Sequence, residues 1–164
     1  VNAVHHNHDV VITVLDNRTT AMTGHQPHPG TAFDGMGRSA KLIKVEDVVK
    51  GCGAGFCKTG DPYDLPAFIG LLAEAGAYAR EQGVAVVIAR RPCLVDKRSG
   101  SISKRIAVRV SDSCTGCGYC IRQFECPAIL FDEANQRAVI DPAACAGCGV
   151  CLHVCPSGAI IKAA

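Results

Sequence analysis

Eight of the 11 cysteines in this 164-residue chain lie in two similar runs towards its C-terminus. Residues 114–120 read CTGCGYC and are followed by Cys126, which precedes a proline. Residues 145–151 read CAGCGVC and are followed by Cys155, also before a proline. Three thiolates from one tight loop bind three irons of a four-iron cubane, and a distant Cys-Pro cysteine supplies the fourth ligand, which in two-cluster proteins serves the other cluster. The pattern therefore predicts two [4Fe–4S] clusters.

The crossed arrangement predicts two ligand sets. Zinc sites also use Cys-x2-Cys pairs, but they require neither the third cysteine nor the one before proline. An odd cysteine count without a secretory signal disfavours disulfides. Five residues separate Cys120 from Cys126, two more than in the second copy, so the second cluster's surroundings are expected to differ. The expected ligands are Cys114, Cys117, Cys120 and Cys155 for the first cluster, and Cys145, Cys148, Cys151 and Cys126 for the second.

Residues 105–164, with all eight ligand positions, resemble the bacterial two-[4Fe–4S] ferredoxin domain. Cys52, Cys57 and Cys93 lack such spacing, and we expect them to be small buried apolar residues. Clusters of this kind move single electrons. A pair of clusters joined to another module therefore indicates a redox reaction in that module.

The segments expected to hold these residues alternate between strand and helix. This order predicts an α/β parallel sheet over residues 1–95, a linker over 96–104 and a small α+β ferredoxin domain over 105–164. Asp64 and Gly83 are expected to cap the long helix, whose apolar face includes Ile69. The predicted strands are 10–15, which is expected to be buried, 41–43, 84–89, 105–110 and the hairpin 129–131 with 138–140; the predicted helices are 45–50 and 65–82.

A polar segment follows the first expected strand, at the end where open α/β sheets bind ligands. Asp16, Asn17 and Thr19 offer oxygen ligands of the kind that Mg²⁺ uses when it also binds a phosphate. A polar turn that only ends the strand is the alternative reading. The residues alone leave both readings open.

Residues 15–30 (LDNRTTAMTGHQPHPG) are similar to the diphosphate-binding segment of 2-oxoacid:ferredoxin oxidoreductases, most of all the large (alpha) subunits of the indolepyruvate type. The resemblance covers nearly the whole chain, because those subunits also end in a two-cluster domain. It implies that the Asn17 side chain and the Thr19 carbonyl coordinate Mg²⁺. It also implies that thiamine diphosphate (TPP) and the substrate lie near the remaining cofactor residues, Asp16, Thr23, Gly24, His25 and Gln26, with His25 or His28 assisting proton transfer.

The resemblance implies a CoA-dependent oxidative decarboxylation of an aryl 2-oxoacid such as indolepyruvate. A small beta subunit and an external ferredoxin are the implied partners. The other half of the TPP motif and the domain that activates the cofactor's pyrimidine do not occur here. We therefore expect a C-terminal piece of a larger subunit that binds TPP weakly by itself. A free-standing electron carrier with a degenerate N-terminal region, or an oxidoreductase for another 2-oxoacid, remains open.

Composition excludes two other classes of function. The formal net charge of +2 is too small for a nucleic-acid-binding surface. The longest apolar run, residues 84–89, is far shorter than the roughly 20 residues that span a membrane. No secretory signal is recognisable, so we expect a cytoplasmic protein.

Overall fold

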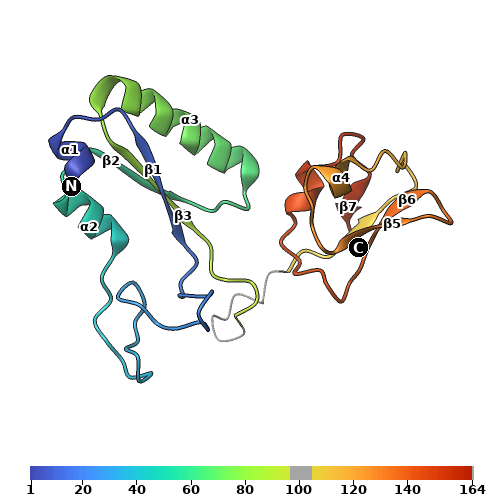
Figure 1. The fold of residues 1–164 in the computed structure, drawn as a ribbon, viewed down its shortest axis with the longest axis horizontal. Helices are drawn as coiled ribbons and strands as arrows, with labels where there is room; N and C mark the ends of the chain where they lie inside the picture. The colour runs from blue at the N-terminus through green and yellow to red at the C-terminus, as the bar shows by residue number, and fades with distance from the viewer. Residues whose placement is uncertain (97–104, 164) are drawn as a thin grey trace. The chain divides into compact units, whose positions relative to one another are not determined.

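The chain forms two compact units, Val1–Ser99 and Gly100–Ala164 (Figure 1). This computed structural model describes residues 1–96 and 105–163. Each unit has its own hydrophobic core. The first unit is an α/β structure with a parallel sheet and the second is a small α+β structure, which confirms the expected fold class. Except for Asp96, the predicted linker lies outside the described residues, and the proposed domain limits stay predictions.

Three parallel strands form the sheet of the N-terminal unit. They are β1 (Val11–Asp16), β2 (Phe56–Gly60) and β3 (Ala85–Arg90), in the spatial order β1-β3-β2. The central strand β3 is buried along its apolar length, as its run of apolar residues predicts. Because the strands are parallel, their carboxyl ends share one edge, and the register pairs Asp16 of β1 with Arg90 of β3.

Several expectations for this unit were wrong. Strand β1 is not buried, because it has a single neighbour among the described strands, and Leu15 is 81% exposed. Residues 41–43 form no strand; the Ile43 N–H instead donates to the Pro29 carbonyl at 2.9 Å. Strand β2 was not anticipated, since its five residues include Lys58, Thr59 and Gly60 and show no apolar run.

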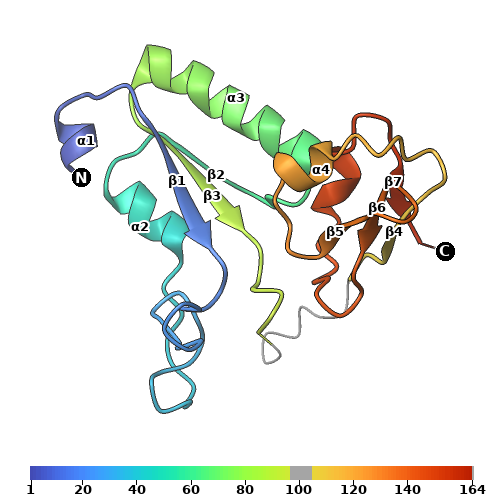
Figure 2. The same ribbon diagram turned by 45° about the vertical axis from the view of Figure 1, so that its right-hand side comes forward.

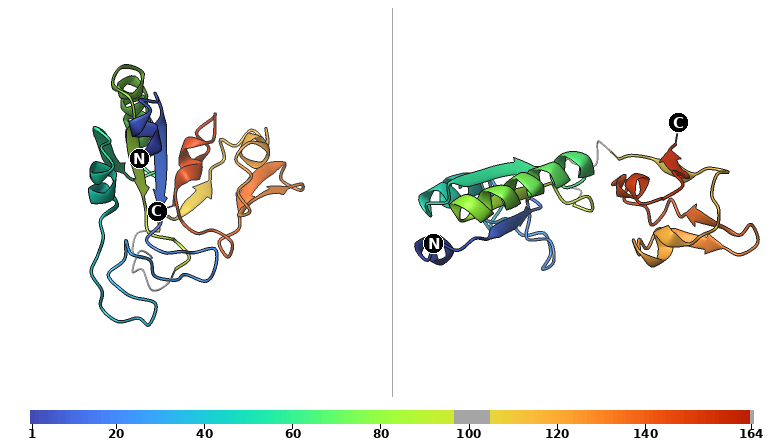
Figure 3. Two further views of the ribbon diagram at one scale, coloured as in Figure 1. Left: turned by 60° about the vertical axis from the view of Figure 1, so that its left-hand side comes forward. Right: turned by 90° about the horizontal axis from the view of Figure 1, so that it is seen from above.

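Helix α3 (Leu65–Gln82) has the predicted bounds. The Asp64 carboxylate caps it by accepting a hydrogen bond from the Ala67 N–H at 3.4 Å. The helix lies along the sheet (Figures 2 and 3). It buries Ala75, although Ile69 is exposed, contrary to expectation. The other helices of this unit are α1 (Asn2–His5) and α2 (Val45–Gly51).

The C-terminal unit consists of short elements around its cysteines. The predicted hairpin is present as β5 (Ile129–Asp132) and β6 (Arg137–Ile140). Strand β4 (Val108–Val110) pairs with β7 (Ile160–Lys162), so only the last half of the strand expected at 105–110 forms. The remaining elements are helix α4 (Tyr119–Arg122) and the 3₁₀ helix η3 (Val150–His153).

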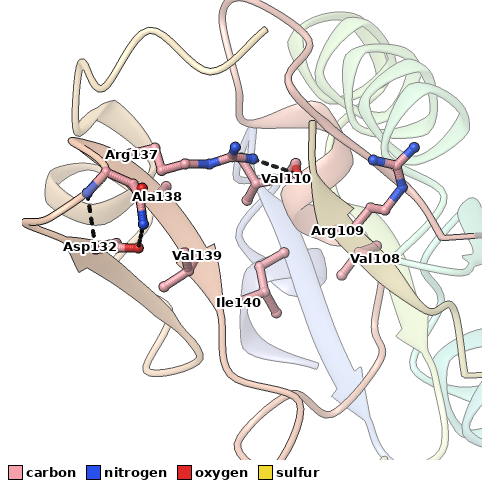
Figure 4. Close-up of a pocket in the computed structure, with 9 residues that line it drawn as sticks. Val108, Arg109, Val110, Asp132, Arg137, Ala138, Val139 and Ile140 are labelled. Atoms are coloured by element: carbon pink, nitrogen blue, oxygen red, sulfur yellow. Dashed lines mark hydrogen bonds between the residues drawn. The ribbon is translucent and has the colours of Figure 1, made fainter. Parts of the chain in front are cut away.

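Arg137 connects the hairpin to β4. Its guanidinium donates to the carbonyl oxygen of Val110 at 2.8 Å, beside a pocket of about 410 Å³ (Figure 4). It also donates to the carbonyl oxygen of Ser111 at 3.1 Å. A further bond to the Asp112 carboxylate at 3.1 Å completes its contacts. Arg137 thus holds the two small sheets of this unit together. None of the helices in the described ranges is both long enough and apolar enough to cross a membrane.

Candidate functional site

The sequence duplication in the C-terminal unit is also a duplication of backbone structure. Gly118 precedes α4 with φ 67° and ψ 9°, and Gly149 precedes η3 with φ 76° and ψ 0°. These left-handed angles favour glycine. A side chain at Gly149 would also come within 2.7 Å of the Ile106 Cδ1 atom. Each glycine therefore lets the chain turn tightly between the second and third cysteines of its run.

The third cysteine of each run points into the core. Cys120 and Cys151 are both 7% exposed and pack with Ile129, Ala138 and Ile160. Burial raises the pKa of the Cys120 thiol, and it raises that of Cys151 to about 11. Both thiols are free. Thiols buried in this way ionise when a cation compensates the charge, which is the role of iron in a cluster.

The neighbours of these two buried thiols come from both runs. Besides Cys114 and Cys117 of its own run, the charge on Cys155 acts on Cys120 and raises its pKa. The corresponding distant neighbour of Cys151 is Cys126, alongside Cys145 and Cys148. Each buried thiol is thus acted on by two cysteines of its own run and by one from the other half of the repeat, and the crossed ligand sets stay a prediction.

Cys155 lies in a different environment. Its sulfur accepts a hydrogen bond from the Ala159 N–H at 3.2 Å and lies 3.3 Å from the Ser157 hydroxyl oxygen. Burial acts to raise the pKa of Cys155, but these and other backbone hydrogen bonds outweigh it and lower the pKa below the ordinary value. The thiolate form, which binds metal, is therefore favoured at this position.

In residues 1–96 and 105–163, no three Cys, His, Asp or Glu side chains converge as ligands of a single metal ion do. A four-iron cluster does not require such convergence, since each thiolate binds a different iron. The donors are all sulfur and mostly lie in or against an apolar core. Their chemistry fits iron–sulfur clusters.

Asp16 anchors the second site, at the carboxyl edge of the parallel sheet. Its side chain is almost fully buried and accepts the Arg18 N–H at 3.1 Å and the Arg90 Nε at 2.6 Å. The Asp16 carbonyl oxygen accepts the Arg91 N–H, and the Asn17 carbonyl accepts the Cys93 N–H, at 3.1 and 3.0 Å. The start of the loop is thereby fixed to the segment that follows β3.

Arg90 extends this network to α2. It donates to both carboxylate oxygens of Glu46, at 2.6 and 3.1 Å. The hydrogen bond from Arg90 lowers the pKa of Glu46 to about 2, despite an opposing effect of burial. Sequence reasoning missed both residues; the available signal was an arginine placed directly after a buried strand, at the ligand-binding edge.

The predicted magnesium ligands lie just beyond Asp16. Asn17 is exposed, and its Oδ1 accepts the Thr19 N–H at 3.2 Å, which forms a tight turn. Within the described residues, no hydrogen bond reaches the Thr19 carbonyl oxygen. The Asn17 amide oxygen and the Thr19 carbonyl are neutral, hard donors that suit Mg²⁺.

The other predicted cofactor residues form a small closed loop. The backbones of Thr20 and Gln26 exchange two hydrogen bonds, at 2.9 and 3.2 Å, so residues between them are held in a turn. Within it, the Thr23 hydroxyl donates to the Gln26 side-chain oxygen at 2.5 Å, and Gly24 has a φ of 111°. The loop brings Thr23, Gly24 and Gln26 together, and their place beside the cofactor stays a prediction.

His25 lies in the same loop with a φ of 58°. Its Nε2 is 3.9 Å from the sulfur of Cys93, a half-buried residue. His28 instead accepts the Gly30 N–H on its Nδ1 at 3.0 Å, which fits a structural role. Cys52 and Cys57 are also half-buried, so the expectation that these three cysteines are buried was wrong.

Family comparison matches both units in sequence order. Residues 1–89 match the C-terminal TPP-binding domain of thiamine pyrophosphate enzymes, and residues 104–159 match the 4Fe-4S dicluster domain. The first match spans more than half of the chain. The chain therefore belongs to the thiamine pyrophosphate enzyme family and carries an iron–sulfur dicluster domain in addition.

Within that class, the chain is similar to indolepyruvate oxidoreductase subunits IorA. It is 42% identical to the Archaeoglobus fulgidus subunit over 165 residues, which cover 98% of this chain and 25% of that protein. The subunit of Methanothermobacter marburgensis is 43% identical, with 98% and 25% covered, and that of Thermococcus kodakarensis is 43% identical, with 96% and 24% covered. The chain thus spans about a quarter of the length of these relatives. No solved structure matches it significantly.

Proposed function

We propose that this chain serves a 2-oxoacid:ferredoxin oxidoreductase of the indolepyruvate type, as its electron outlet and part of its TPP site. The observation that carries the proposal is the 4Fe-4S dicluster domain, with its duplicated cysteine run, that follows a TPP-binding domain. The proposed reaction converts a 2-oxoacid, CoA and two oxidised ferredoxins into acyl-CoA, CO₂, two reduced ferredoxins and a proton. A small beta subunit completes the enzyme, and the external ferredoxin is the acceptor.

The crossed sets supply the ligands of two [4Fe–4S] clusters. When bound, TPP supplies the nucleophilic carbon and accepts the electron pair released with CO₂, and the clusters pass electrons on singly. The first set is Cys114, Cys117, Cys120 and Cys155, and the second is Cys145, Cys148, Cys151 and Cys126. The eight cysteines of the duplicated segment are free thiols, which suits a reducing compartment, and we place the enzyme in the cytoplasm.

The strand-end loop holds the diphosphate through Mg²⁺. The Asn17 side chain and the Thr19 carbonyl bind the ion, and the loop 23–26 lies against the diphosphate and the substrate. Asp16 positions Asn17 and Thr19, since it accepts the Arg18 N–H between them. His25 holds or releases a proton at Nε2 during turnover.

Paired cysteine variants test the ligand sets. The anaerobically reconstituted chain should bind about eight irons, four for each cluster. In Cys120→Ala/Cys155→Ala, both changes fall on one cluster, so about four irons should remain. In Cys151→Ala/Cys155→Ala, each cluster loses a ligand, so both should be damaged. Equal iron loss in the two double variants would overturn the crossed sets, and Cys93→Ala is the control that should keep all the iron.

Turnover tests the reaction. In the complete oxidoreductase that contains this chain, indolepyruvate and CoA should bleach the cluster absorbance and release CO₂. An electron carrier with a degenerate N-terminal region would keep its iron but release no CO₂. A preference for pyruvate over indolepyruvate would show that the enzyme acts on another 2-oxoacid.

A further inference from the structure

A pocket of about 660 Å³ opens beside the strand-end loop of the N-terminal unit. Small-molecule sites typically have volumes of roughly 300–1,000 Å³. One part of its lining is polar and includes Arg18, Thr19 and His25. Another part is apolar and includes Phe33, Leu42 and Pro92. A ligand with a polar end and an apolar end matches this division.

The polar part of the lining overlaps the cofactor loop, the segment of residues 16–26 that contains the predicted cofactor ligands. Thr19 and His25 line the pocket, so a ligand there would lie next to the residues that we propose to bind Mg²⁺ and to hold a proton. Arg18 donates to the Gly30 carbonyl at 3.0 Å, and its Nε is 3.9 Å from the Asp16 carboxylate. A guanidinium has five N–H donors, so Arg18 retains donors for a ligand carboxylate. Asp96 also lines the pocket, so a carboxylate is better held at Arg18 than there.

The apolar wall is held in place by backbone hydrogen bonds. The Ile43 N–H donates to the Pro29 carbonyl, and the Ala40 N–H to the Ala32 carbonyl, both at 2.9 Å. Between them, the Arg38 guanidinium forms an ion pair with Asp34 at 2.8 Å. The loop of residues 29–43, which carries Phe33 and Leu42, is therefore held by backbone hydrogen bonds near its ends and by an ion pair within it.

The aromatic ring of this wall remains largely in contact with water. Phe33 is 57% exposed and Leu42 is 39% exposed, although both line the pocket. A flat aromatic ligand would cover this surface and pair with the Phe33 ring. A methyl group would cover little of it. The lining therefore favours a 2-oxoacid with an aryl side chain over pyruvate.

We propose that this pocket binds an aryl 2-oxoacid, with Arg18 at the carboxylate and with Phe33 and Leu42 against the ring. Phe33 and Leu42 then determine which side chain the enzyme accepts. This inference rests on the oxidoreductase function proposed above.

The test measures kcat/KM for phenylpyruvate and for pyruvate in the complete oxidoreductase. Phe33→Ala should lower kcat/KM for phenylpyruvate about tenfold or more, and should change that for pyruvate less than about twofold. Leu42→Ala should act in the same direction with a smaller effect. Met36→Ala is the matched control, because Met36 lies in the same loop of residues 29–43, is 79% exposed and does not line the pocket.

Three outcomes would contradict the inference. An unchanged ratio of the two kcat/KM values in Phe33→Ala would remove the pocket from side-chain recognition. A higher KM for TPP at an unchanged ratio would assign the pocket to the cofactor. If the unmodified enzyme converts neither acid, the proposed function itself fails, and this inference fails with it.

Discussion

The two units differ in where their predicted functional side chains lie relative to the hydrophobic core. In the N-terminal unit the core is made of ordinary apolar residues such as Phe56, Ala75 and Val87, and the site lies in loops beyond the strand ends. In the C-terminal unit, five of the eight predicted ligands belong to the core or pack against it. Removing a ligand-binding loop from the first unit would leave its core intact. Removing iron from the second would change the core itself.

This difference follows from size. The C-terminal unit has strands of three or four residues and helical segments of four, too few to bury a large apolar core. Small domains of this kind commonly depend on disulfides or metals for stability. The N-terminal unit has an 18-residue helix against a parallel sheet, and its core contains none of the predicted cluster ligands.

Metal removal should give the largest effect. Anaerobic chelation of iron should unfold the C-terminal unit, because buried thiols lose the cation that cross-links them, and should leave the N-terminal unit folded. Hydrogen exchange measures this: protection of the β6 amides should fall at least about tenfold, while that of the β3 amides stays unchanged. Equal protection of β6 with and without iron would contradict the comparison.

Two glycines with the same φ allow the effect of backbone strain on stability to be distinguished from the effect of side-chain packing. Gly149 and Gly37 both have a φ of 76°, but a side chain at Gly37 meets nothing within 4 Å, whereas one at Gly149 meets Ile106. Gly37→Ala should therefore lower the free energy of unfolding by about 1 kcal/mol. Gly149→Ala should lower it by about 2–4 kcal/mol and should also cause a loss of bound iron. Denaturation and iron analysis measure both. Equal costs would show that the cysteine loop tolerates repacking.

A smaller effect than at Gly149 is expected at Glu46. Its pKa is lowered from the ordinary 4.5 to about 2, so its stabilising contribution is complete above pH 4.5 and disappears as the pH falls towards 2. Glu46→Gln should lower the unfolding free energy of the N-terminal unit by about 1–3 kcal/mol at pH 7 and by progressively less below pH 4.5. Urea denaturation followed by NMR signals from β3 measures it.

Glu74 provides the matched control for Glu46. It pairs with Lys58, but both side chains are about half exposed, at 52% and 51%. Glu74→Gln should therefore change stability by less than about 0.5 kcal/mol. If both variants cost the same at pH 7, the Arg90 network does not support the loop.

Features that depend on short-range spacing were predictable. Three cysteines at Cys-x2-Cys-x2-Cys spacing with a further cysteine before proline indicated a cluster-binding loop from local sequence alone, and the duplicated run indicated crossed ligands. Helix α3 could be bounded because Asp64 and Gly83 act within one turn of its ends. The β5–β6 hairpin joins neighbouring segments, so its pairing required no long-range information.

Only the tertiary structure decided three features: the order of the sheet strands, the Asp16–Arg90–Glu46 network and the pocket beside Phe33. Asp16 and Arg90 are separated by 74 positions and become partners only through the β1–β3 register. Apolar patterning marks which segments pair, but it does not specify which charged groups meet at the strand ends. The chain's own residues thus determined that it binds clusters, whereas long-range packing decided how the cofactor loop is held.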